Sequence, residues 1–151
     1  MKLAEALMLR ADYQTKIYDL KQRISNNTKI QDGEEVSEDP AELFKMLDET
    51  LSNLEDIIIR INNTNSKVFV DDQHTLGDLI VKRDTLKKSI NIYTNILQNA
   101  TIKYDRMMRT EIKYVTTINI ANLQKQVDDL SKEFRELNVK LQEKNWTTDL
   151  L

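Results

Sequence analysis

The chain has 151 residues, of which 31 % are charged, and a formal net charge of −3 at pH 7. With two glycines and one proline it has too few turn residues for a β-sandwich of this length, which favours an all-α protein. The mildly acidic balance gives no general attraction to nucleic acid, and the lack of cysteine excludes disulfides, thiolate catalysis and cysteine-ligated zinc.

The first expected helix begins at the N-terminal end of the sequence. Residues 1–12 superficially resemble a signal peptide, but Glu5 interrupts the apolar core and the same apolar spacing continues to Ile24. No stretch approaches 18 apolar residues, so we expect no membrane span and a cytoplasmic location. The stripe of this helix, in steps of three and four, is Leu3, Ala6, Arg10, Tyr13, Ile17, Leu20 and Ile24.

The second expected helix has a clear start signal. Asp39 is a suitable N-cap, Pro40 suits the first turn, and Glu42 completes a capping-box pattern. The asparagine-rich runs 26–27 and 62–65 follow helices one and two, where residues that tolerate the left-handed conformation end a helix. The apolar stripe is Phe44, Leu47, Leu51, Leu54, Ile58 and Ile61.

Two further stripes predict helices three and four, which Thr75 and Asn119 can cap. The third stripe is Leu76, Leu79, Arg83, Leu86, Ile90, Tyr93, Leu97 and Ala100, and the fourth is Ile120, Leu123, Val127, Leu130, Phe134, Leu137 and Leu141. Such stripes must be buried against other helices. We therefore expect one domain, residues 1–151, folded as an antiparallel up-down four-helix bundle.

The connections are longer than a minimal bundle requires. Residues 110–118 alternate in the manner of a strand. In an up-down bundle the first and third connections fall at the same end, so we expect residues 28–31 to pair with part of 111–117 as a small two-stranded β-ribbon.

No residue pattern predicts a catalytic, cofactor or metal site. His74 is the only histidine, and it lacks the companions that a metal site or a hydrolase triad needs. Lys103, Arg106, Arg109 and Lys113 form a basic cluster with Tyr104 and Tyr114, but acidic residues dilute it and we expect no nucleic-acid partner.

Arg10 and Arg83 stand at stripe positions that are otherwise apolar. A guanidinium that faces a bundle interior needs carboxylate partners, and Glu55, Asp56 and Glu143 are the candidates. Two interpretations are open: a polar layer that fixes register or oligomeric state, with the arginine heads otherwise reaching water, or an anion-binding pocket.

Trp146, Leu150 and Leu151 form the candidate interface of the chain. A tryptophan followed by two leucines suggests a tail that docks, either on its own bundle or on a neighbouring subunit.

Several short motifs, in order along the whole chain, resemble a bacterial family labelled septicolysin. They are residues 1–7 with Arg10-Ala11-Asp12, Glu38-Asp39-Pro40, residues 60–65, Lys82-Arg83-Asp84, Tyr104-Asp105-Arg106, Glu111-Ile112-Lys113 and residues 145–150. Gln73 and Thr116 depart from the family's pattern, which tends to have glycine and proline there. The label implies a haemolytic toxin, whereas the residues provide no thiol and no pore-forming strand pair.

The leading hypothesis is therefore a non-enzymatic helical-bundle protein that acts by self-association or by binding another protein. The first alternative is the membrane-active toxin that the family label implies. The second is an enzyme or small-anion binder that uses Arg10 and Arg83.

Overall fold

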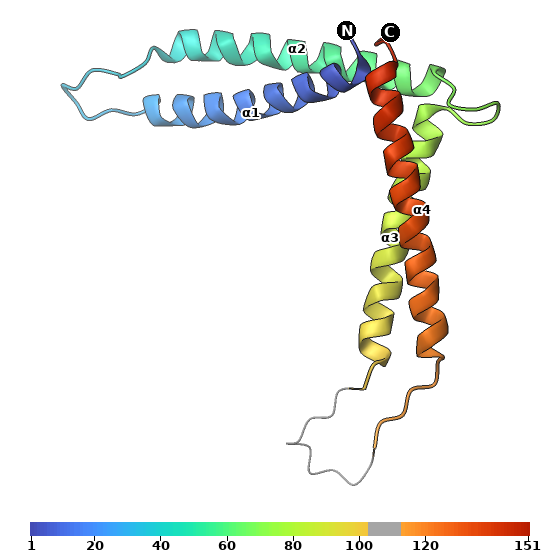
Figure 1. The fold of residues 1–151 in the computed structure, drawn as a ribbon. Helices are drawn as coiled ribbons and strands as arrows, with labels where there is room; N and C mark the ends of the chain where they lie inside the picture. Colours follow the sequence, from blue (N-terminus) through green and yellow to red (C-terminus); the bar gives the residue numbers. More distant parts are fainter. Residues whose placement is uncertain (103–112) are drawn as a thin grey trace. The chain divides into compact units, whose positions relative to one another are not determined.

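The computed structural model describes residues 1–102 and 113–151 (Figure 1). Within them lie four helices: α1 (Leu3–Asn27), α2 (Pro40–Lys67), α3 (Leu76–Ala100) and α4 (Ile120–Thr147). The helices are 25 to 28 residues long. The all-helical class and the four helices are thus confirmed.

The chain divides into two compact units. Unit 1 consists of Met1–Gly77 and Gln142–Leu151, and unit 2 of Asp78–Leu141. The prediction that residues 1–151 form one domain is not tested by this division and stays a prediction.

In unit 1, α1 and α2 lie side by side as a helical hairpin (Figure 1). Leu20 and Ile24 of α1 form a buried cluster with Leu43 of α2, and Met46 and Leu47 pack against it. Every predicted stripe position of α1 is buried or half-buried. The 3-4 spacing therefore identified the face that α1 buries.

The buried face of α2 differs from the predicted one. The fully buried residues of α2 are Leu43, Thr50, Ile57, Ile61 and Thr64. Of the predicted stripe, Phe44 remains 48 % exposed and Leu51 44 % exposed. The buried residues Leu43, Thr50 and Ile57 thus each lie one position before a member of the predicted stripe. The reason is that α2 is apolar over a face wider than one partner helix can cover.

The helix starts follow the expected caps. The Asp39 carboxylate accepts a hydrogen bond from the Ala41 N–H (3.0 Å), and Asn119 Oδ1 accepts one from the Asn122 N–H (3.0 Å). Helix α1 ends at Asn27, in the predicted asparagine run, but the expected left-handed conformation is wrong, because no non-glycine residue in the described part of the chain has a positive φ. Helix α2 continues through the asparagines at 62, 63 and 65 to Lys67.

The acidic connection between α1 and α2 is tied together at its base. Arg23 donates from Nε to both carboxylate oxygens of Glu38, each at 3.1 Å, and Asn27 Oδ1 accepts from the Glu38 N–H at 3.1 Å. This side-chain hydrogen bond from Arg23 lowers the pKa of Glu38. Gly33 (φ 91°) occupies the turn that the Glu34 N–H closes onto the Gln31 carbonyl.

In unit 2, α3 and α4 run alongside each other (Figure 1), with an ion pair of 2.9 Å between Lys82 and Glu133. The predicted stripes of both helices are confirmed, since all their members are buried or half-buried. The most buried among them are Leu76, Leu79, Leu86, Val127 and Leu141.

The structure does not support the β-ribbon. Residues 28–31 and 113–117 form no strand, and residues 111 and 112 lie outside the described part. The first segment instead completes α1 and the following turn: Thr28 Oγ1 donates to the Ser25 carbonyl (3.0 Å), and the Gln31 carbonyl accepts from Glu34. Its polar groups are therefore already used locally. Two isolated bridges, Lys2 with Asp149 and Phe69 with Thr75, are the β-pairing of the described residues.

Candidate interaction surfaces

The first surface lies in unit 1, where the two ends of the sequence meet. The Leu3 N–H donates to the Thr148 carbonyl at 2.9 Å, and the Leu150 N–H donates to the Met1 carbonyl at 3.0 Å. These bonds flank the bridge between Lys2 and Asp149, so residues 148–151 lie extended beside residues 1–3. We call residues 148–151 the strap.

Helix α2 holds the far end of the strap. The Leu151 N–H donates to Thr64 Oγ1 at 2.9 Å, and Arg60 Nε donates to the Leu151 main-chain oxygen at 3.1 Å. Thr64 is fully buried, and its hydroxyl also donates to the Arg60 carbonyl at 2.8 Å. The seat of the strap is therefore Met1, Lys2, Leu3, Arg60 and Thr64.

An ion pair supports the backbone pairing. Lys2 Nζ lies 2.8 Å from Asp149 Oδ1 and also donates to the Thr147 carbonyl at 3.3 Å. The hydrogen bond from Lys2 lowers the pKa of Asp149 below its usual value of 3.8. Both side chains are substantially exposed, so this contact orients the strap more than it stabilises the fold.

The three candidate interface residues occupy different environments. Leu150 is buried, with 9 % of its surface exposed, whereas Leu151 and Trp146 are 54 % and 55 % exposed. The tail thus docks on the unit to which it belongs through Leu150 and its backbone. Trp146, near the end of α4, presents half of its surface to solvent.

Sequence reasoning missed Arg60 and Thr64 as strap-binding residues. A threonine at a seam position of an amphipathic helix was the available signal, because a buried hydroxyl needs a partner. Thr50 carries the same signal, yet its hydroxyl only donates to the Met46 carbonyl of its own helix, at 2.7 Å. The pattern therefore does not distinguish a threonine that binds another segment from one that does not.

The two candidate arginines lie in different units. Arg83 donates from Nε and from Nη2 to Asp84, its neighbour in sequence, at 3.0 and 2.8 Å. Arg10 is half-buried and forms no ion pair with the expected carboxylates 55, 56 and 143 within the described residues. A site that contains both arginines therefore stays a prediction.

His74 takes part in a turn between α2 and α3. Asp71 Oδ1 accepts from the Gln73 N–H (3.0 Å) and from the His74 N–H (2.8 Å), and it lies 2.9 Å from His74 Nδ1. These bonds lower the pKa of Asp71. Both side chains serve the turn, and no group of three metal-ligating side chains is found in residues 1–102 and 113–151.

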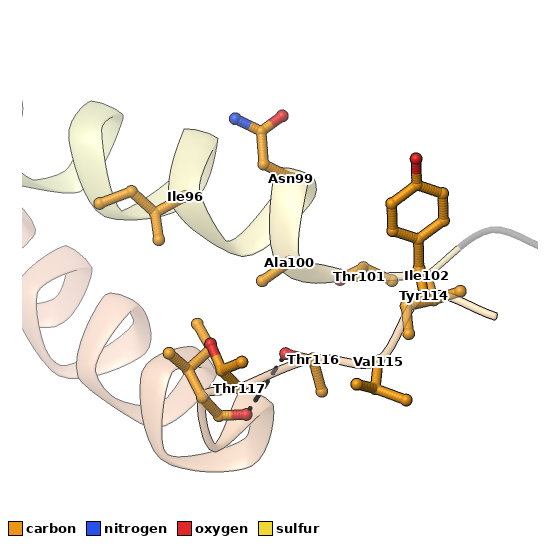
Figure 2. Close-up of a pocket in the computed structure, with 10 residues that line it drawn as sticks. Ile96, Asn99, Ala100, Thr101, Ile102, Tyr114, Val115, Thr116 and Thr117 are labelled. Carbon is orange, nitrogen blue, oxygen red and sulfur yellow. Dashed lines mark hydrogen bonds between the residues drawn. The ribbon is translucent and has the colours of Figure 1, made fainter. Parts of the chain in front are cut away.

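An open cavity of about 580 Å³ lies in unit 2, between the end of α3 and the segment that leads into α4 (Figure 2). Its wall is made of both apolar and polar side chains, and within the segment that leads into α4 Thr116 Oγ1 donates to the Ile118 carbonyl at 3.5 Å. Its described lining is Ile96, Asn99, Ala100, Thr101, Ile102 and residues 114–118. Lys113 and Tyr114 of the basic cluster are exposed, and its other members lie outside the described residues.

None of the described helices is long and apolar enough to cross a membrane. This agrees with the sequence-based expectation of no transmembrane span.

Comparison with known proteins gives a family and a full-length structural match. A family model described as "Family of unknown function (DUF6847)" matches residues 10–150. The crystal structure of a functionally unknown conserved protein from Corynebacterium diphtheriae is similar, with 36 % identity and a TM-score of 0.94, and the match covers 100 % of this chain and 99 % of that chain. No curated protein matches the chain.

These findings overturn the resemblance to the septicolysin-labelled family. Neither the matching family nor the similar structure carries that label, and nothing in either description indicates a toxin. The motifs that suggested it are short, at three to seven residues each, and matches of such short motifs carry a high risk of false positives. The chain belongs to the family DUF6847, which is described as a family of unknown function.

Proposed function

We propose that this chain is a non-enzymatic helical protein that acts by self-association or by binding a helix of another protein. The observation that carries the proposal is a second apolar stripe on α2, beside its buried seam. Phe44 and Leu51 are 48 % and 44 % exposed, and Ile58 is half-buried. We call these three residues the outer stripe.

The outer stripe has the geometry of a helix-docking surface. Its members recur every seven residues, so they form a line on one side of α2 that is about 21 Å long at 1.5 Å per residue. Asp48 and Glu55 border this line, are exposed, and form no ion pair within the described part of the chain. An apolar line with a charged border is typical of helix-to-helix contacts.

Covering this stripe with further helices would give the antiparallel up-down bundle that the sequence predicts. A pair of helices buries one seam, whereas a helix with two apolar stripes is stable when it contacts two or more neighbours. A cytoplasmic location is part of the same proposal.

The non-enzymatic part of the proposal follows from the available chemistry. The sequence has no cysteine and one histidine, and the nearest partner of that histidine is a turn aspartate. Arg83 is engaged by Asp84. These observations favour an interaction role over a small-anion site built on Arg10 and Arg83.

Sedimentation equilibrium over a range of protein concentrations tests the proposal. The wild-type chain should associate, and the double variant Phe44→Ser with Leu51→Ser should associate more weakly. Burial of a full apolar side chain contributes about 1.5–3 kcal/mol. Since about half of each side chain remains to be covered, the loss should be on the order of tenfold to a hundredfold.

The matched control is Val81→Ser with Val139→Ser, which removes two apolar side chains that are each 66 % exposed but stand outside the outer stripe. This control should associate like the wild type. A wild-type chain that stays monomeric at every concentration and does not retain a protein partner, or an outer-stripe variant that associates like the control, would contradict the proposal.

A further inference from the structure

We infer that the seat of the strap is an exchangeable peptide site, which takes residues 148–151 of a second copy of this chain. This inference rests on the proposed self-association and names a contact for it. The seat offers backbone groups of residues 1–3, the Thr64 hydroxyl and the Arg60 guanidinium to an extended segment. All of these contacts are local to four residues of the strap.

The contacts that the seat makes with the strap are made by residues 148–151 themselves. Two bonds from backbone to backbone fix the extended conformation, and Thr64 and Arg60 hold the N–H and the oxygen of Leu151. Lys2 selects an acidic side chain at the position of Asp149, and Leu150 is the buried anchor. The ligand class is therefore a short extended peptide with an acidic residue followed by leucine, and main-chain addition of this kind is a common mode of peptide binding.

The strap is also suited to exchange. It follows directly on the end of α4, where the Thr148 N–H still bonds to the Lys144 carbonyl at 2.9 Å. The strap has no secondary structure of its own that would have to unfold when it leaves its seat. The ion pair between Lys2 and Asp149 is substantially exposed, so breaking it costs little. Exchange of an identical element between copies replaces each lost contact by the same contact, which makes it a low-cost route to a dimer.

The absence of cysteine in this chain permits a direct test with full-length proteins. Lys2 and Asp149 are bridge partners whose flanking residues make the backbone bonds, a geometry in which side chains approach closely. The variants Lys2→Cys and Asp149→Cys each carry a single cysteine, so a disulfide between the two positions can form only between copies. Mixed and oxidised mildly, they should give mainly the mixed dimer, at least about fivefold over either homodimer.

Two comparisons complete the test. In the double variant Lys2→Cys with Asp149→Cys, the strap and seat of one copy can also close on each other, which confirms that the geometry permits the bond. A mixture in which the disulfide dimers form in random proportions, or only dimers of like variants form, would overturn the inference.

Charge reversal provides a second measurement that does not depend on oxidation. Lys2→Asp and Asp149→Lys each place like charges in the contact of a like pair, whereas in their mixture both exchanged contacts pair opposite charges. The aspartate introduced at position 2 meets the lysine introduced at position 149, and the unchanged Lys2 of the second variant meets the unchanged Asp149 of the first. The mixed species should form at least about threefold more tightly than either variant with itself, and equal affinities would overturn the inference.

Failure of this inference can be distinguished from failure of the proposed function. If the wild type self-associates and the outer-stripe variant weakens it while both mixing tests are negative, the exchange is wrong and the proposed self-association stands. If the wild type shows no association in the sedimentation test and no mixed disulfide forms, the self-association half of the proposed function and this inference are both wrong.

Discussion

The strap contact makes Thr64→Val the most informative single substitution. Valine has nearly the shape of threonine and is equally β-branched, so packing and helix propensity change little. What the substitution removes is the hydroxyl that donates to the Arg60 carbonyl and accepts from the Leu151 N–H. Thr50→Val is the matched control, because Thr50 lies in the same helix and the same seam and makes only the bond within its helix.

The expected magnitude follows from the one hydrogen bond in which the two threonines differ. Such a bond contributes about 0.5–1.5 kcal/mol net, and a buried N–H left without a partner costs about 1–3 kcal/mol. Thr64→Val should therefore destabilise the protein by about 1–2 kcal/mol more than Thr50→Val. For a chain of this size that difference corresponds to roughly 2–8 °C in Tm.

Urea unfolding followed by circular dichroism at 222 nm measures both variants. A double-mutant cycle with Asp149→Lys adds a second criterion, because a strap that is already loosened has less to lose from the Thr64 substitution. Equal destabilisation by the two valine substitutions would refute the view that the Thr64 hydroxyl holds the strap. If the effects of Thr64→Val and Asp149→Lys simply add, the contact at Thr64 and the contact at Asp149 do not cooperate in holding the strap.

Three other predictions concern the rest of unit 1. Leu20→Ala should destabilise the protein by about 2–5 kcal/mol in the urea assay, since Leu20 is 1 % exposed in the cluster with Ile24. The control Ile59→Ala, at a half-exposed position, should cost less than about 1 kcal/mol. Gly33→Ala should cost about 1–2 kcal/mol by thermal melting, because a φ of 91° is unfavourable for alanine although the added methyl group would meet nothing within 4 Å. The pKa of Glu38 is lowered in the folded state, so the contribution of its carboxylate to stability is present at neutral pH and is lost as the pH falls through that lowered pKa. The difference in urea midpoint between wild type and Glu38→Gln should therefore shrink from pH 7 to pH 3. A difference that persists at pH 3 would contradict this reasoning.

The features that the sequence predicted correctly depend on local chemistry. Asp39 with Pro40 and Asn119 start their helices by satisfying free N–H groups within the next few residues, so no tertiary information is needed. The stripes of α1, α3 and α4 were correct because one apolar line per helix left a single choice of buried face. The single-domain arrangement and the candidate sites depend on tertiary contacts, and they stay predictions.

The strap shows why the candidate site was only partly predictable. The sequence indicated that a tail with Leu150 docks, because an apolar residue after a polar helix end needs cover. It gave no indication of the seat, whose members are backbone groups of residues 1–3 together with Arg60 and Thr64, more than 80 positions away from the strap in sequence. Backbone donors have no sequence signature, and only the fold brings them next to the strap.

Helix α2 shows how one error in the sequence-based prediction bears on function. The predicted stripe and the buried seam share Ile61, and Leu47 and Leu54 of the stripe are half-buried, but Thr50 is buried where the stripe has the exposed Leu51. Hydrophobicity favours Leu51 for the interior, yet Thr50 can satisfy its hydroxyl on the Met46 carbonyl, so its burial costs little. A helix that buries threonine while leaving leucine and phenylalanine half-exposed has apolar surface that its hairpin partner does not use. Covering that surface with a second helix would contribute about 25 cal/mol of favourable free energy for each Å² of apolar area removed from water, which is the physical basis for proposing an interaction role.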